Sequence, residues 1–144
     1  VLRIDAKELG TSYWVELQKS LDEARVDYLA LAGFMRIIPL DFVVRWEGRM
    51  VNIHPSLLPA FKGTHVHEQA IAAGVKMSGC TVHFVRFAVD SGPIVAQAVV
   101  PVHPDDDEAT LHERIKAAER DMLVIEVGRL ARDGGRPDHP ATGE

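Results

Sequence analysis

The sequence predicts an α/β protein in which helices flank a mainly parallel sheet. Helical and strand patterns alternate through the first half of the chain, as they do when crossover helices join parallel strands. Residues 28–32 are almost all apolar and are followed by Gly33, which is typical of a strand buried on both faces. Near the other end, apolar residues alternate at spacings of 4 and 3 and predict a long helix packed on the sheet: Leu111, Ile115, Ala118, Met122 and Ile125.

The remaining elements follow in order along the chain. Residues 11–24 carry apolar side chains at spacings of 3 and 4 and begin with Thr11 and Ser12, which can cap a helix. Pro39 opens a short helix that continues through Trp46, and a strand is expected at 50–54. A helix over 65–73 ends at Gly74.

Two consecutive strands are predicted in the second half, and these can pair antiparallel. Residues 80–87 alternate, with Cys80 and Val82 on one face and His83 on the other, and 94–102 follow a Gly-Pro turn signal. Acidic residues at 105–108 suit the start of the last helix, because the helix dipole favours negative charge there. Residues 133–144 are rich in glycine and proline, and we expect a mobile tail.

Composition narrows the class of function. The chain has 144 residues, 47% of them hydrophobic and 26% charged, which fits one folded domain. A net charge of -5 without a long basic run argues against nucleic acid as the main partner. One cysteine excludes an internal disulfide and a multi-cysteine zinc site. No signal peptide is visible and no apolar run nears the ~18 residues of a membrane span, so we expect a cytoplasmic protein without a membrane partner.

The densest cluster of polar residues lies at the end of the strand expected at 50–54. Asn52 and His54 are two residues apart, so their side chains point to the same face, and Pro55 keeps His54 extended. An amide beside an imidazole can stabilise an oxyanion, and ligands bind at this end of open sheets. The alternative is an ordinary strand end with a hydrogen-bonded histidine.

Two further clusters accompany it. His65 and His67 could bind a metal with His54 and Asp90, but the usual helical spacing of zinc ligands is absent, and we predict no metal. A helix-capping or substrate-contacting role is the alternative. Asp90 follows a strand, where it could raise the pKa of His54 and relay protons, or only form local hydrogen bonds.

Residues 33–38 follow the first buried strand. Apolar side chains around Arg36 could line a groove for a flat ring with acidic groups, and a loop with incidental packing is the alternative. Cys80 and His83 are interpreted as structural, the first as a small buried side chain.

Together these motifs resemble the folate-dependent formyltransferase family. The resemblance covers about Asp27 to Leu130, and it rests above all on Asn52-Ile53-His54-Pro55-Ser56-Leu57-Leu58-Pro59 and the downstream Asp90-Ser91-Gly92. It implies a Rossmann-like formyltransferase fold with Asn52, His54 and Asp90 as the catalytic trio. It also implies that Gly63 and His65 contact a nucleotide substrate or support the trio. The pterin pocket implied for the folate comprises Met35, Arg36, Ile37, Ile38, Phe87, Ala88 and Val89.

The activity that the resemblance implies is formyl transfer from 10-formyltetrahydrofolate to the amine of glycinamide ribonucleotide, in purine biosynthesis. The partners are then small molecules, with a homodimer as a further option. Hydrolysis of 10-formyltetrahydrofolate is the main rival. Formylation of methionyl-tRNA is a third reading, which the acidic charge disfavours.

The chain departs from the family at its beginning. It opens on Val1, and the family's first strand and glycine-rich phosphate loop have no counterpart. We therefore expect an N-terminally truncated catalytic domain over 1–132 and a tail over 133–144. A chain that is inactive without its N-terminal segment or a partner is the non-enzyme alternative.

Overall fold

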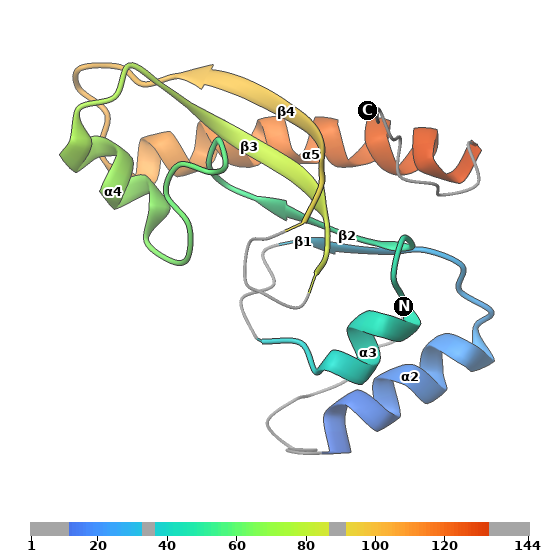
Figure 1. The fold of residues 1–144 in the computed structure, drawn as a ribbon. Helices are drawn as coiled ribbons and strands as arrows, with labels where there is room; N and C mark the ends of the chain where they lie inside the picture. Colours follow the sequence, from blue (N-terminus) through green and yellow to red (C-terminus); the bar gives the residue numbers. More distant parts are fainter. Residues whose placement is uncertain (1–11, 33–36, 87–91, 133–144) are drawn as a thin grey trace.

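The computed structural model describes residues 12–32, 37–86 and 92–132. Helices lie on both sides of a four-stranded sheet (Figure 1). In chain order the elements are α2 (Tyr13–Glu23), β1 (Leu29–Ala32), α3 (Leu40–Arg45), β2 (Met50–His54), α4 (Val66–Ala73), β3 (Met77–Phe84), β4 (Ile94–Pro101) and α5 (Glu108–Arg132). The predicted α/β class is confirmed.

The sheet is mixed. Its order is β1-β2-β3-β4; β1 pairs with β2 in parallel, whereas β2 with β3 and β3 with β4 pair antiparallel. The antiparallel pairing predicted for the last two strands is confirmed, but the expectation of a mainly parallel sheet is not met among these strands. The reason is the position of α4, which lies beyond the end of β2 instead of crossing a face of the sheet (Figure 1). The chain therefore re-enters the sheet from that end, and β3 runs back along β2 with Thr81 opposite His54.

Two hydrophobic clusters fill the spaces between the sheet and the helices. One joins α5 to β2, β3 and β4 through residues such as Ile53, Val82 and Leu111. The other joins α2 and α3 to the opposite face, around Phe42 and Trp46. Because helices cover both faces, β3 is buried on both sides, from Ser78 to Phe84.

Several local predictions need correction. Ala30 and Ala32 are exposed, because β1 lies at an edge of the described sheet; the strand predicted to be buried on both faces is only half-buried. β3 begins at Met77, three residues before the predicted start. Ser12 occupies the N-cap of α2 but makes no capping hydrogen bond with its side chain. The predicted tail over 133–144 lies outside the described residues.

The last helix is longer than its apolar stripe predicted. Leu111, Ile115 and Met122 are buried as expected, but Ile125 is 62% exposed. Asp107 starts the helix, since its carboxylate accepts a hydrogen bond from the backbone N–H of Thr110 at 2.8 Å. The helix starts where the acidic residues predicted it would.

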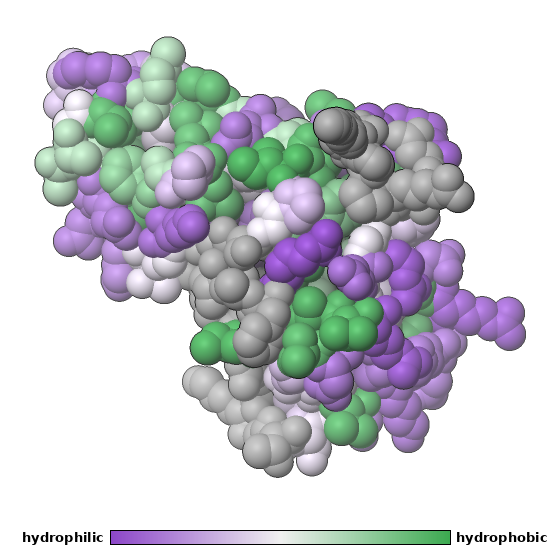
Figure 2. Space-filling view, in the orientation of Figure 1, coloured by the Kyte–Doolittle hydropathy of each residue, from purple (hydrophilic) through white to green (hydrophobic). Residues whose placement is uncertain are grey.

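On the face in Figure 2, apolar side chains of the described residues gather over α3 and around α4, between polar regions. Exposed apolar residues on these elements and their neighbours include Leu40, Val44 and Met77. In the described part of the chain, no helix has the length and apolar character needed to cross a membrane.

Candidate active site

β2 carries the two central candidates at its carboxyl end. His54 is buried, 1% exposed, and its Nε2 lies 2.9 Å from the carbonyl oxygen of Phe61. Asn52 is half-buried on the same face of the strand. The Oδ1 atom of Asn52 is buried and has no hydrogen-bond partner among the described residues. A buried amide atom without a partner costs free energy, and a ligand that supplies the missing bond recovers it.

His67 lies close to His54 and is held neutral. It is 8% exposed, and its ring stacks on that of His112 from α5 with centroids 4.8 Å apart. Burial, and then the charges of His112 and His54, lower the pKa of His67 to about 4. At neutral pH this histidine therefore adds no positive charge beside His54.

The described residues do not form the metal site that the sequence offered as an alternative, with His54, His65 and His67 as ligands. His65 is exposed at the start of α4, with its Nδ1 3.9 Å from a carboxylate oxygen of Glu68. The group of described residues that comes within metal-ligand distance is His65, Glu68 and Glu108, all of them exposed, and it includes neither His54 nor His67. Asp90, the fourth ligand of that alternative, lies outside the described residues.

Of the other predicted site residues, the structure describes some and not others. Gly63 has φ +84°, a conformation that favours glycine, in the loop that leads to His65. Ile37 is 70% exposed, whereas Ile38 packs beside Phe42 in the cluster under α2 and α3. The remaining folate-pocket candidates lie outside the described residues: Met35, Arg36, Phe87, Ala88 and Val89.

Sequence reasoning missed a polar face of α5 that borders the ends of β1 and β2. A cavity of about 300 Å³ lies between them, lined on the sheet side by Ala32, Ile53 and Pro55. The helix contributes a mixed set of side chains: His112, Lys116, Glu119, Arg120 and Leu123. Their spacing of 3 and 4 is the signal in the sequence that indicates this face, beside the apolar stripe of the same helix.

The cavity combines cationic groups with one carboxylate. Burial raises the pKa of Glu119, and the charge of Lys116 partly opposes that shift. Lys116 and Arg120 bring positive charge to the same side. An anionic ligand that also carries an amine would match this arrangement.

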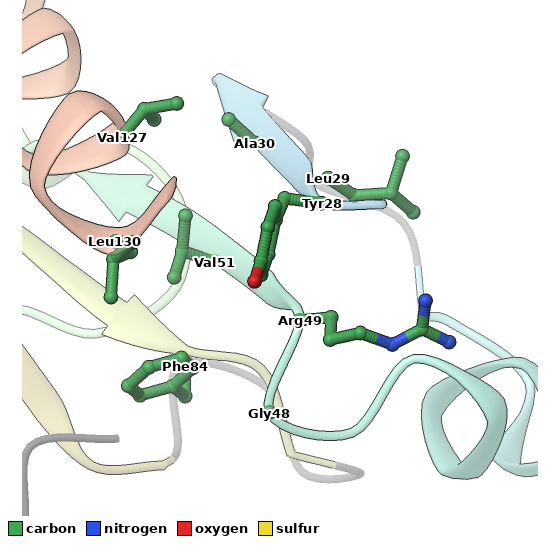
Figure 3. Close-up of a pocket in the computed structure, with 9 residues that line it drawn as sticks. All are labelled: Tyr28, Leu29, Ala30, Gly48, Arg49, Val51, Phe84, Val127 and Leu130. Carbon is green, nitrogen blue, oxygen red and sulfur yellow. The ribbon is translucent and has the colours of Figure 1, made fainter. Parts of the chain in front are cut away.

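A second pocket lies at the opposite ends of β1 and β2 and holds none of the predicted site residues. Leu130 of α5 lies beside Val51 and Phe84, and Val127 extends on the side of Ala30, while the side chain of Arg49 points away (Figure 3). Its lining therefore offers little for catalysis.

The burial predicted for Cys80 is confirmed, whereas the structural role of His83 stays a prediction. Cys80 is fully buried, and burial raises the pKa of its thiol to about 11. His83 is 2% exposed, with Nδ1 3.0 Å from the carbonyl oxygen of Phe84.

Known proteins resemble this chain over most of its length. The family model described as formyl transferase matches residues 5–127. A phosphoribosylglycinamide formyltransferase of Mycobacterium tuberculosis is 55% identical over 108 residues, which cover 75% of this chain and 50% of that protein. The trifunctional purine biosynthetic protein adenosine-3 of Homo sapiens is 57% identical over 111 residues, 77% of this chain and 11% of that protein. The chain thus spans half or less of the length of these curated relatives.

Solved structures agree. The crystal structure of phosphoribosylglycinamide formyltransferase from Anaplasma phagocytophilum matches with a TM-score of 0.81 and 47% identity, covering 83% of this chain and 59% of the other. A formyltetrahydrofolate deformylase from Pseudomonas syringae pv. tomato matches with a TM-score of 0.77 at 30% identity, covering 86% and 41%. With the family model matching far more than half of its residues, this chain belongs to the formyl transferase family.

Proposed function

We propose that this chain transfers a formyl group from 10-formyltetrahydrofolate to the amine of glycinamide ribonucleotide, a step of purine biosynthesis. The observation that carries the proposal is the pair formed by Asn52 and His54 on one face of β2. The buried Oδ1 of Asn52, which lacks a partner among the described residues, can accept a hydrogen bond from the attacking amine, and Nδ2 of the same amide is the donor to the oxyanion. The relatives named phosphoribosylglycinamide formyltransferase support the choice of acceptor. The cytoplasmic location and the homodimer remain predictions.

Asn52 and protonated His54 stabilise the transition state. The ribonucleotide amine attacks the formyl carbon, and a new C–N bond forms while the carbonyl oxygen becomes an oxyanion. The side-chain amide of Asn52 and the imidazolium of His54 donate hydrogen bonds to that oxygen. The bond to the folate nitrogen then breaks. Asp90 orients His54 and helps the amine's proton reach the leaving nitrogen, through water.

The cavity beside α5 is proposed to hold the acceptor. The charges of Lys116 and Arg120 attract the phosphate of the ribonucleotide, and Glu119 attracts its amine. Gly63 and His65 are proposed to contact the same substrate from the loop before α4. Residues 35–38 and 87–89 are proposed to hold the pterin ring of the folate.

The rival function is hydrolysis of 10-formyltetrahydrofolate, with water in place of the amine. The observation that favours this second candidate is that one similar solved structure is named a formyltetrahydrofolate deformylase. The cavity separates the two functions, because an attacking water does not need a pocket lined by two cations and a carboxylate. The transferase is therefore preferred.

The test is to follow the release of tetrahydrofolate by absorbance, with and without glycinamide ribonucleotide, and to detect the formylated product by mass spectrometry. We expect release only when the ribonucleotide is present. Release at the same rate without it would establish the hydrolase instead. No release in either condition would contradict the proposal that this chain carries the activity.

Variants of the cavity sharpen this test. Glu119→Gln and Lys116→Ala should raise the KM for the ribonucleotide about tenfold and leave the KM for the folate within twofold. Glu23→Gln and Lys76→Ala are matched controls at exposed positions on other parts of the chain. Equal changes in the KM of both substrates would contradict the assignment of the cavity to the acceptor.

A further inference from the structure

The turn that follows His54 returns a carbonyl group to the histidine's own ring. The chain leaves β2 at His54 and comes back seven residues later, where the carbonyl oxygen of Phe61 lies 2.9 Å from Nε2. A carbonyl oxygen can only accept a hydrogen bond, so Nε2 carries the hydrogen in this contact. In a neutral imidazole only one ring nitrogen is protonated, and this bond therefore favours the form with hydrogen on Nε2.

Ser56 ties the two sides of the turn together. Its hydroxyl lies 2.5 Å from the carbonyl oxygen of Ala60 and 3.0 Å from that of Phe61. The second of these is the oxygen that meets His54. Ser56 is 1% exposed, so water does not compete for these bonds. Its one hydrogen is shared between the two oxygens, with the shorter contact to Ala60, so the hydroxyl holds both carbonyl groups of the turn near the ring.

Thr81 anchors the turn to the sheet. Its hydroxyl donates to the carbonyl oxygen of Ser56 at 2.8 Å and accepts from the backbone N–H of Leu58 at 3.1 Å. The amide of Gln97 donates to the Thr81 hydroxyl at 3.0 Å and to the carbonyl oxygen of Leu58 at 2.9 Å. Thr81 is fully buried and stands opposite His54 in the pairing of β2 with β3. Two strands thus hold the turn in one place.

From this geometry we infer that the turn sets the tautomer of His54, with Ser56, Thr81 and Gln97 as positioning residues. Neutral His54 carries its hydrogen on Nε2, and Nδ1 is the nitrogen that gains and loses a proton during the reaction. The three residues act on catalysis only through the ring that they orient. The kinetic part of this inference rests on the proposed formyl transfer, whereas the tautomer does not.

Nuclear magnetic resonance of the whole chain labelled with 15N-histidine tests the tautomer directly. The 15N shift distinguishes protonated from unprotonated ring nitrogens, and the His54 signals are identified by their loss in His54→Asn. The sample is held at pH 9, well above the ordinary histidine pKa of about 6.5. We expect His54 to be neutral with hydrogen on Nε2. Hydrogen on Nδ1, or a mixture of both forms, would overturn the inference whether or not the chain is active.

Thr81→Val and Thr81→Ser form a matched pair for the positioning role. Valine keeps the shape and removes the hydroxyl, and serine restores it. We expect Thr81→Val to populate both tautomers of His54 and to lower kcat for formyl transfer about tenfold, with the KM for the folate within twofold and with rescue by serine. An unchanged tautomer of His54 and an unchanged kcat in Thr81→Val would contradict the positioning role of Thr81.

A second variant guards against loss of folding. Gln97→Met removes two hydrogen bonds from an exposed residue, and we expect a smaller shift of the tautomer in the same direction. If wild-type His54 shows hydrogen on Nε2 and yet no formyl transfer is found, the proposed function fails and the tautomer stands. The two failures are thus distinguishable.

Discussion

Acid should destabilise this protein through His67. Burial lowers the pKa of this residue from 6.5 to about 4 in the folded protein, and the nearby charges of His112 and His54 act in the same direction. Above pH 6.5 neither the folded nor the unfolded state binds a proton here, so the residue has no effect on the pH dependence. Between pH 6.5 and 4 only the unfolded state binds a proton at this residue. The free energy of unfolding therefore decreases as the pH is lowered through this range. Below pH 4 both states are protonated and the effect is complete.

The size follows from the two pKa values. Each unit of difference is worth about 1.4 kcal/mol, so the folded state should lose about 3 kcal/mol between pH 7 and pH 4 through this residue. Urea unfolding of the wild type and of His67→Leu at several pH values isolates that contribution, because leucine cannot titrate. We expect the stability of the wild type relative to His67→Leu to fall by about 3 kcal/mol over this range.

The control is His103→Leu, the same substitution at an exposed loop position. This variant measures the effect of replacing an exposed histidine by leucine at each pH. A constant difference between the wild type and His67→Leu from pH 7 to pH 4 would refute the reasoning, since it would mean that folded His67 titrates as freely as the unfolded residue.

Two further predictions concern stability. Gly79→Ala should cost about 1–3 kcal/mol or more in urea unfolding, because an added Cβ would overlap the carbonyl oxygen of Ala98 on the paired strand. By contrast, Gly128→Ala, where the nearest atom is 3.4 Å away on the flexible side chain of Arg132, should gain about 0.5–1 kcal/mol; equal effects of the two would contradict the packing described. Asp106→Asn should destabilise the protein, since Arg114 binds this carboxylate through two hydrogen bonds of 2.7 and 2.9 Å and holds its pKa below the ordinary range. The depressed pKa means that wild-type Asp106 stabilises the fold at pH 7 and loses this effect in acid. The difference in unfolding temperature between the wild type and Asp106→Asn should therefore be larger at pH 7 than at pH 3. A difference that grows in acid would refute this prediction.

Short-range patterns predicted the elements well. The apolar stripe of α5, the glycine after α4 and the strand that carries Asn52 and His54 all depend on neighbours within a few residues. The pairing of strands depends on where the connecting helix lies, and no local pattern in α4 indicates that it stays beyond the end of β2. For this reason the class was predicted and the mixed sheet was not.

The site shows the same division. Asn52 and His54 were recognisable because the period of a strand puts both side chains on the same face and the neighbouring Pro55 keeps His54 extended. Thr81 and Gln97 stand 25 and 39 residues from their partners Ser56 and Leu58, and a threonine or a glutamine in a strand carries no signal of such contacts. The polar face of α5 was visible as a spacing, but only folding brings it to the ends of β1 and β2.

The central claim is that Asn52 and His54 carry out formyl transfer, and rates of product formation test it most directly. The formylated ribonucleotide is quantified by mass spectrometry for the wild type, Asn52→Ala and His54→Ala, with His103→Ala as an exposed control. Asn52 is the only asparagine in the chain, so no second asparagine can replace it. We predict a loss of about a hundredfold or more in each of the two site variants and none in the control. Turnover at the wild-type rate in Asn52→Ala or His54→Ala would contradict the account.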